Sequence, residues 1–358
     1  MGRERLALYS LVGPESERAV ERGLANAVWF KADVPRKRMK ELMQRSDSPA
    51  IRDTAIWLGG MLVLGAAAVW VWTTVSPWLA APVFLLYGLL YGSAGDSRWH
   101  EAGHGTAFKT RWMDTIVYEI ASFMMMREPT VWRWTHTRHH TDTLIVGRDP
   151  EIAVMRPARL ARILLNFFGL VDVPTSFRLM FLHAVGRLTP DEADVVPEQE
   201  QPRVYRKARI WLLIYAATLA AAVLSGSIVP FLLIGGPRVY ATFMHLVYAL
   251  TQHAGMGEDV LDHRLNTRTV RMCWFNRFLY WNMNYHVEHH MYPLVPYHRL
   301  PELHEEIQHE LAAVYPSIWA AYKELVPAIL RQLKDQKYYV RRELPPGATP
   351  FNEPALAG

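Results

Sequence analysis

Long runs of apolar residues alternate with polar, charged segments along this chain. The apolar runs lie at about residues 54–75, 79–95, 210–226 and 228–252. An α-helix rises about 1.5 Å per residue, so runs of this length predict helices that cross a membrane. Pro77 predicts a tight turn after the first run, and Gly235-Gly236-Pro237 predicts a break in the last. We therefore expect an all-α protein with two transmembrane hairpins; buried core helices of a soluble protein are the alternative.

The charges beside these runs predict an orientation. Residues 1–53 carry eleven Lys or Arg, whereas the turn between the first two runs carries none. Positively charged loops stay on the cytoplasmic side, so we expect a cytoplasmic N-terminus. Four crossings then return the C-terminus to the same side. The loop 96–206 and the tail 254–358 would form a cytosolic helical cap, and a bacterial inner membrane is favoured over the endoplasmic reticulum.

The same pattern predicts three parts of the chain. Residues 1–53 are a cytosolic N-terminal segment, residues 54–310 are the main membrane domain, and residues 311–358 are a C-terminal cytosolic helix with an irregular tail. Within the cap, residues 112–126 are apolar but interrupted by acidic residues. We expect them to form an amphipathic helix that lies in the membrane interface.

Composition excludes several classes of protein. The 13 Trp and the 51% of hydrophobic residues fit a membrane protein. The net charge is +5, but no basic stripe with interleaved aromatic residues predicts nucleic-acid binding. The single cysteine, Cys273, excludes a disulfide framework within the chain and a Cys-ligated zinc or iron–sulfur site. No signal peptide is expected, because the first 50 residues are polar, and no G-x-G-x-x-G motif predicts a dinucleotide site.

Eight histidines stand in three short motifs. The motifs are His100-Glu-Ala-Gly-His104, His136-Thr-Arg-His139-His140 and His286-Val-Glu-His289-His290. Residues three and four apart share a helix face, so each motif points two or three imidazoles the same way. Imidazole is the commonest side-chain metal ligand, and one structural zinc needs only four ligands. Chance explains one such motif among 15 His, but three of them favour two metal ions, for which iron, copper, zinc and nickel are all suitable.

A ninth ligand is expected at the end of the fourth apolar run. His253 lies there, and His100 and His104 follow the second run, so neighbouring helix ends would present imidazoles at one depth. His263 is the rival ligand, but its polar neighbours predict a surface loop or helix. His245 lies on nearly the same helix face as His253, which predicts either a substrate-channel residue or a hydrogen bond inside the membrane.

Polar residues near the motifs are candidates for orienting the histidines. A carboxylate that accepts a hydrogen bond from the non-ligating ring nitrogen fixes the tautomer and the orientation of the ring. The carboxylate candidates are Asp149, Glu101 and Glu288, and Asn284 is a candidate contact for a metal-bound water. A solvated charge or a helix cap is the alternative role for the carboxylates.

The motifs and their positions resemble those of the membrane-bound fatty-acid desaturase and hydroxylase superfamily. The resemblance covers about residues 54–310 and includes the segments 134–140 and 284–293. It implies a non-haem di-iron site, dioxygen as oxidant and a mushroom-shaped helical protein with a cytosolic cap. It also implies an external electron donor, namely a ferredoxin-type, rubredoxin-type or haem protein with its reductase. The substrate would be a lipid or a hydrophobic small molecule.

Two features bear on which reaction the resemblance implies. The first motif has three residues between its histidines, as in alkane hydroxylases and many acyl-lipid desaturases, whereas stearoyl-CoA desaturases have four. Those enzymes also have Asn one helical turn before the extra histidine, where this chain has Ala249. We expect oxidation of an aliphatic C–H bond, most simply by a fatty-acyl desaturase. A hydroxylase or oxidative demethylase of a smaller molecule is the alternative, and a membrane metal-binding or transport protein is the alternative from another class.

Overall fold

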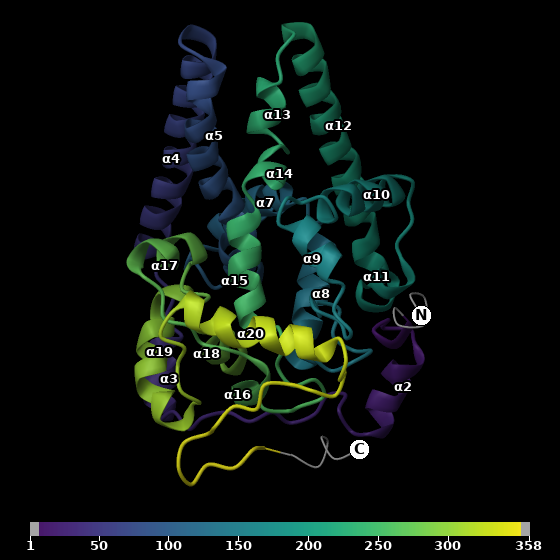
Figure 1. Ribbon diagram of the computed structural model, residues 1–358, viewed down its shortest axis with the longest axis vertical. Coiled ribbons are helices and arrows are strands. Elements are labelled where there is room, and N and C mark those ends of the chain that lie inside the picture. The colour runs from purple at the N-terminus through teal and green to yellow at the C-terminus, as the bar shows by residue number, and fades with distance from the viewer. Residues whose placement is uncertain (1–6, 352–358) are drawn as a thin grey trace.

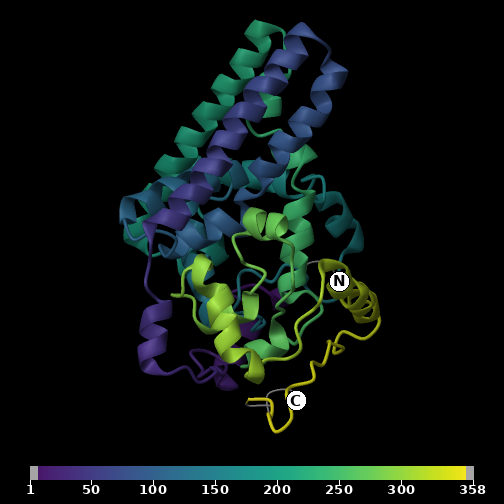
Figure 2. The same cartoon turned by 90° about the vertical axis from the view of Figure 1, so that its left-hand side faces the viewer.

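The computed structural model describes residues 7–351, and the regular elements among them are all helices, with two isolated β-bridges. The expected all-α class is therefore confirmed. Two groups of helices extend to one end of the molecule, and the shorter helices and both ends of the described chain lie at the other (Figure 1). Viewed from the side, the long helices α4 (Asp47–Thr74), α5 (Pro77–Gly92) and α12 (Gln201–Ser225) rise together to that end (Figure 2).

The first hairpin joins α4 to α5 through the predicted turn. The Ser76 hydroxyl accepts a hydrogen bond from the backbone N–H of Trp78, and Pro77 occupies the first turn of α5, where its missing N–H costs nothing. The buried indole of Trp57 donates to the carbonyl of Leu90 at 2.7 Å and ties the two helices together. Their outer faces expose large apolar side chains, Trp78 among them at 87%, as expected for surfaces that contact lipid.

The expected fourth span is not one helix. Residues 228–253 fold as α13 (Val229–Leu233), α14 (Pro237–Tyr240) and α15 (Phe243–His253). Gly235 has a φ of +82°, and Pro237 cannot donate to the preceding turn, so the helix is interrupted over several residues and not at a single point. Within residues 7–351, three helical stretches are long and apolar enough to cross a membrane: Arg36–Thr74, Pro77–His104 and Glu198–Ser225.

A distorted turn, and not a straight helix, connects α5 to the first histidine motif. A π turn, η1 (Ala94–Arg98), separates α5 from α6 (Trp99–His104), and Asp96 within it has a φ of +46°. The buried Arg98 guanidinium donates to the carbonyls of Leu279 and Phe278 at 2.7 and 3.0 Å. These bonds anchor the turn to the cap, because a buried guanidinium without acceptors would be costly. The anchored turn sets the position of α6.

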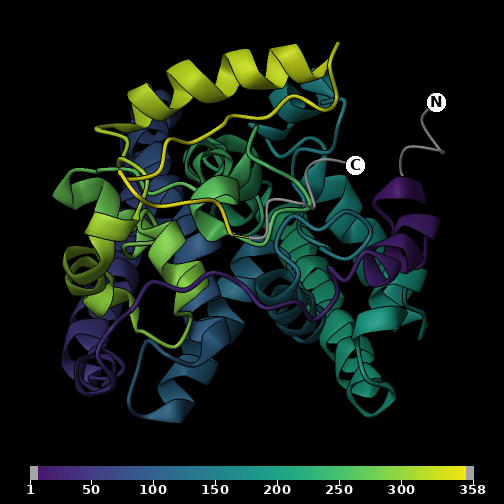
Figure 3. The same ribbon diagram turned by 90° about the horizontal axis from the view of Figure 1, so that it is seen from below.

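The remaining helices form the cap around the lower ends of the long helices. The amphipathic helix predicted at 112–126 is α7 (Arg111–Met125), which exposes Trp112 and buries Tyr118. Seen from below, α20 (Ile318–Gln332) lies along one edge of the molecule (Figure 3). The other cap helices are α2 (Pro14–Glu21), α3 (Arg36–Leu42), α8 (Pro129–Thr141), α9 (Leu160–Asn166), α10 (Asp172–Ala184), α11 (Pro190–Val195), η2 (Glu198–Glu200), α16 (His263–Asn266), α17 (Trp274–Tyr280), α18 (His286–Met291), η3 (Tyr297–Arg299), α19 (Leu300–Ile307) and η4 (Gln308–Glu310).

Candidate metal centre

Four helices, α6, α8, α15 and α18, carry nine histidines that meet beneath the long helices. Their ring nitrogens form two groups, and within each group the atoms lie within 4.8 Å of one another. The five-histidine group consists of His100, His104, His136, His140 and His289, and the four-histidine group consists of His139, His253, His286 and His290. The structure thus brings together every histidine of the three motifs together with His253.

The Nε2 atoms of the five-histidine group face one another. His136 Nε2 lies 3.1 Å from the Nε2 atoms of His100, His104 and His140. His289 Nε2 lies 2.7 Å from that of His100 and 3.1 Å from that of His140. At most one proton can lie between any two of these nitrogens, so five converging nitrogens leave lone pairs that point at a common centre. A cation at that centre satisfies them.

The four-histidine group repeats the arrangement. His286 Nε2 lies 3.1 Å from His253 Nε2 and 3.2 Å from His290 Nε2. The His139 ring lies 5.1 Å from that of His253 and 4.9 Å from that of His290, measured between ring centroids. His139 and His140 are neighbours on α8 yet belong to different groups, as do His289 and His290 on α18. Each of these two helices therefore contributes histidines to both groups.

Oxygen atoms hold the outer nitrogen of four of these rings. Nδ1 of His136 contacts Glu151 at 2.9 Å, Nδ1 of His139 contacts Asp149 at 2.9 Å, Nδ1 of His253 contacts the Asn266 carbonyl at 3.0 Å, and Nδ1 of His290 contacts the Thr143 hydroxyl at 3.2 Å. The Thr143 hydroxyl donates its own proton to the carbonyl of His139 at 2.6 Å, so it accepts from His290. With the proton on Nδ1, each Nε2 keeps its lone pair and faces inward, the state that binds a metal.

Burial sets the protonation of the cluster. It lowers the pKa of His136, His140, His286, His289 and His290 well below the ordinary histidine value, and neighbouring imidazoles lower it further. Burial also lowers the pKa of His139, but the charge and hydrogen bond of Asp149 outweigh it and raise the pKa to about 9. Neutral imidazoles are the ligand form, so the histidines with a lowered pKa are ready to bind a metal ion, whereas His139 must release a proton when it binds one.

Local packing fixes where α8 meets α6. The indole of Trp132 stacks on the His136 ring at a centroid distance of 4.2 Å and an angle of 14°. Gly103, between His100 and His104, lies against the same indole, and a Cβ atom at residue 103 would clash with it. Glycine is therefore required here for close approach and not for an unusual backbone angle. The contact sets the distance between the first two motifs.

Three of the four predicted orienting residues contact something other than the nine histidines. Glu101 accepts hydrogen bonds from the Thr106 hydroxyl and the Tyr297 backbone N–H at 2.8 and 2.9 Å. Glu288 contacts His304 and the Thr269 hydroxyl, and the Asn284 amide donates to the carbonyl of Val270. Helical periodicity explains why Glu101 and Glu288 do not contact the nine histidines. A glutamate next to a histidine on a helix points away from the face that the histidines share.

His263 and His245 were also considered in the sequence analysis, and neither belongs to a histidine group. His263, expected in a surface loop, is buried at 2% exposure and stacks on Trp29 with ring centroids 4.4 Å apart. Its ring lies 5.0 Å from that of His290, and it belongs to neither histidine group. The surface expectation was wrong because its polar neighbour Asp262 forms a buried ion pair with Arg264. His245 lines a large cavity beside the site, with its Nδ1 3.9 Å from Asp96.

Glu151 is the site residue that the sequence analysis missed. Its carboxylate holds His136 in the way that Asp149 holds His139, and burial raises the pKa of Glu151 to about 8 against the opposing effect of His139. A signal was present, because Asp149 and Glu151 lie two residues apart in one loop after the second motif. The Asp149 carboxylate also accepts from the Glu151 N–H at 2.7 Å, which fixes that loop.

An all-α fold with three apolar helices and a buried cluster of nine histidines defines a membrane protein with a candidate metal centre. The sequence model described as fatty acid desaturase matches residues 76–322, and the chain belongs to this family. That membership makes it a desaturase-like oxidoreductase.

Curated relatives have the same family name at low identity. The chain is 25% identical over 277 residues to the omega-6 fatty acid desaturase, endoplasmic reticulum isozyme 1, of Glycine max, a match that covers 67% of this chain and 71% of that protein. It is 26% identical over 251 residues to the delta(5) fatty acid desaturase fat-4 of Caenorhabditis elegans, covering 61% and 55%. It is 22% identical over 255 residues to a delta(8)-fatty-acid desaturase of Euglena gracilis, covering 63% and 59%.

Proposed function

We propose that this protein is a dioxygen-dependent di-iron oxidoreductase that oxidises an aliphatic C–H bond, most simply as a fatty-acyl or lipid desaturase. The observation that carries the proposal is the division of nine imidazoles into groups of five and four with their Nε2 atoms turned inward. Each group would hold one iron. When bound, such a pair of ions supplies activation of dioxygen for attack on unactivated C–H bonds.

The residues of the chain perform distinct tasks in this proposal. The nine histidines hold the metal ions, and Glu151 and Asp149 keep His136 and His139 in the tautomer that presents Nε2. The rings of both groups are largely buried, which keeps bulk water away from the reacting atoms. The cavity lined by His139 and His253 admits the substrate to the four-histidine group.

The proposal includes a membrane topology with four crossings. The first hairpin is α4 with α5, and the second is α12 with the broken segment α13 to α15. Interrupted helices are tolerated at membrane depth where protein surrounds them. Both termini and the histidine cap would lie on the cytoplasmic side, consistent with the position of both ends of the described chain at the cap end in Figure 1 and with the basic N-terminal segment.

Hydroxylation or oxidative demethylation is a second candidate for the reaction at the same site. One observation favours it: the cavity beside His139 and His253 has several charged side chains, including Asp96, Arg127 and Asp172. A saturated acyl chain offers such groups no hydrogen bond. Transport of metal ions is the candidate from another class, and it requires no dioxygen.

The product of the reaction distinguishes these candidates. Iron-loaded protein in lipid nanodiscs is supplied with ¹⁸O₂, a reduced ferredoxin system and lipid extract, and His136→Ala is the inactive control. Desaturation lowers the mass of the product by two hydrogens and leaves no label in it. Hydroxylation adds one ¹⁸O atom to the product. An absence of iron-dependent dioxygen consumption with every donor tested would contradict the oxidoreductase proposal.

A further inference from the structure

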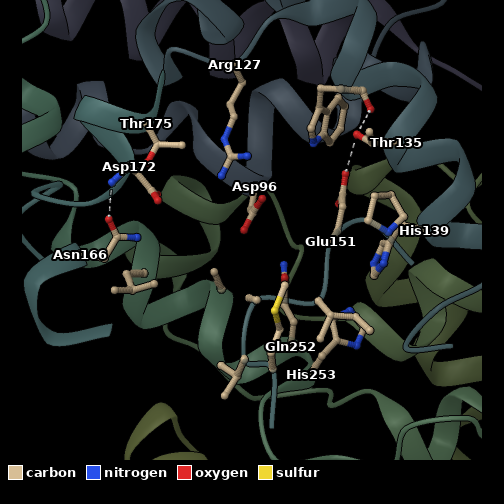
Figure 4. A pocket seen from close by; sticks show the side chains of 18 of the residues that line it. Asp96, Arg127, Thr135, His139, Glu151, Asn166, Asp172, Thr175, Gln252 and His253 are labelled. Carbon is tan, nitrogen blue, oxygen red and sulfur yellow. Dashed lines mark hydrogen bonds between the residues drawn. The ribbon is translucent and has the colours of Figure 1, made fainter. Parts of the chain in front are cut away.

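A large cavity lies beside the four-histidine group. Its volume is about 590 Å³, within the usual range for a small-molecule site. His139 and His253 line this cavity. Among its lining residues in the described part of the chain, there is no histidine of the five-histidine group. Figure 4 shows charged and polar side chains pointing into this space. The cavity is therefore the approach to the candidate metal centre, and its lining bears on the substrate.

Two strained turns place opposite charges in the cavity. Asp96, with a φ of +46°, lies in the π turn after α5, and Arg127 directly follows Met126, which has a φ of +55° at the end of α7. Non-glycine residues in this region are held there by their surroundings and cluster at functional sites. In Figure 4 the Arg127 guanidinium points into the space between Asp172 and Asp96. Both Asp96 and Arg127 line the cavity.

Neither side chain is fully satisfied by the protein. The His245 imidazole faces Asp96, but its Nδ1 lies 3.9 Å from the carboxylate and makes no hydrogen bond among the described residues. Arg127 has no hydrogen bond or ion pair from its guanidinium in residues 7–351, and Asp172 instead lies 3.8 Å from Arg238. Asp96 and Arg127 therefore remain available as an acceptor and a donor for a ligand.

The polar lining continues as far as the histidines. Glu151 and Thr135 border the cavity on the His139 side, and Gln252 borders it next to His253 (Figure 4). Ala249 also lines the cavity and leaves room one helical turn before His253. An acyl methylene chain lying here would desolvate these groups without replacing their hydrogen bonds to water, which is unfavourable.

We infer that the cavity binds a hydroxyl-bearing group of the substrate, so that the oxidised carbon lies within a few bonds of a hydroxyl and not in the middle of a long acyl chain. A hydroxyl both accepts from a guanidinium and donates to a carboxylate, which matches Arg127 and Asp96 together. This inference rests on the proposed function, since it takes the histidine groups as the reaction centre. The hydroxyl belongs either to a lipid head group or to a small water-soluble molecule.

Binding without turnover tests the inference. Iron(II)-loaded protein in detergent under anaerobic conditions is titrated calorimetrically with 1-monopalmitoylglycerol, with palmitic acid and with sorbitol. The variants are Asp96→Asn and Arg127→Gln, and the controls are Asp33→Asn and Arg36→Gln, which change exposed residues outside the cavity. Iron content and thermal unfolding are measured for each protein, so that loss of binding is not confused with loss of the fold or the metal.

We expect a hydroxyl-bearing probe to bind and each cavity variant to weaken that binding at least tenfold, with both controls unchanged. Binding of monopalmitoylglycerol alone identifies a lipid head group as the source, and binding of sorbitol identifies a small polar molecule. Binding of palmitic acid that equals that of monopalmitoylglycerol and is insensitive to Asp96→Asn and Arg127→Gln overturns the inference. So does binding of none of the three by protein that retains two irons and oxidises lipid. Protein without iron contradicts the proposed function instead.

Discussion

Each imidazole in the cluster has two nitrogens, and the protein uses the outer one to direct the inner one. Asp149, Glu151, the Asn266 carbonyl and Thr143 each hold an Nδ1 atom, so the corresponding Nε2 atoms converge. Removing such an outer partner leaves the ring free to rotate or to change tautomer. Outer partners of metal-ligating histidines typically contribute about 10–100-fold in metal affinity or activity.

Glu151→Gln tests this role on His136. The amide keeps the size of the side chain but loses its charge, so we expect iron affinity to fall roughly 10–100-fold with the fold intact. Iron content after dialysis against a chelator series measures the effect. Asp33→Asn, which alters an exposed carboxylate far from the histidine motifs in the sequence, is the control. Equal iron retention by Glu151→Gln and the native protein would show that the carboxylate does not orient the ligand.

His253 and His263 give opposite predictions although they lie ten residues apart. His253→Ala removes a member of the four-histidine group, so bound iron and turnover should both fall sharply. His263→Ala removes a buried ring stacked on Trp29, so we expect two irons but a loss of about 1–3 kcal/mol in the free energy of unfolding. Iron analysis and detergent-phase unfolding of both variants decide. Retention of iron by His253→Ala together with its loss from His263→Ala would reverse the assignment.

Sequence spacing anticipated which histidines converge, because i, i+3 and i+4 positions share a helix face. It did not anticipate the burial of His263, which depends on pairing between Asp262 and Arg264 and on packing against the distant Trp29. The sequence analysis also missed Glu151. The loop that turns this carboxylate toward His136 is fixed by its own hydrogen bonds and lacks the regular residue spacing from which a helix face can be predicted.

Among the elements, the contact between α6 and α8 sets the spacing of the first two histidine motifs. Gly103 allows the Trp132 indole to lie against α6. The long apolar helices followed directly from the hydropathy pattern. The break at Gly235-Gly236-Pro237 was also predicted, because those residues disfavour a helix, but the division of residues 229–253 into three short helices was not. Nor was the π turn at residues 94–98, which depends on tertiary contacts that override local propensity. Gly88, for example, lies against Ala241 of the broken segment, where a larger residue would clash.

Gly103→Ala should disturb the centre although it removes no ligand. The added methyl group meets the Trp132 ring, so α6 and α8 must move apart, and we expect reduced iron content and a lower unfolding temperature. Gly59→Ala in α4 is the matched control, because no heavy atom lies within 4 Å of a Cβ at that position. It should be neutral or stabilising by up to about 1 kcal/mol. Equal iron content and equal unfolding temperature of the two variants would show that the contact between Gly103 and Trp132 does not position the histidines.

At the scale of the whole molecule, the fold combines apolar helices with a cap that encloses the histidines. The sequence predicted this division through its hydropathy and charge, but it gave no view of the cavity. Asp96, Arg127 and Glu151 come from three separate segments, and only the tertiary fold brings them to one space. The substrate specificity of this protein is therefore the property least accessible from its sequence.

We expect a separate protein to supply the electrons for the proposed reaction. No dinucleotide-binding motif occurs in the sequence, and no Cys-based electron carrier is possible with one cysteine. We expect iron-loaded protein with dioxygen, substrate and NADH or NADPH to be inactive until a reduced ferredoxin, rubredoxin or haem protein is added. Product formation is measured with and without each donor. Turnover on nicotinamide cofactor alone would contradict this expectation.

The central claim is that nine histidines in groups of five and four hold two iron ions. The most direct measurement is elemental analysis, with Mössbauer spectroscopy, of protein produced in ⁵⁷Fe-supplied cells and purified without added metal. The account predicts two irons per chain in two different nitrogen-rich environments, because the groups differ by one ligand. One zinc per chain, with no gain of activity when the protein is reconstituted with iron, would contradict it.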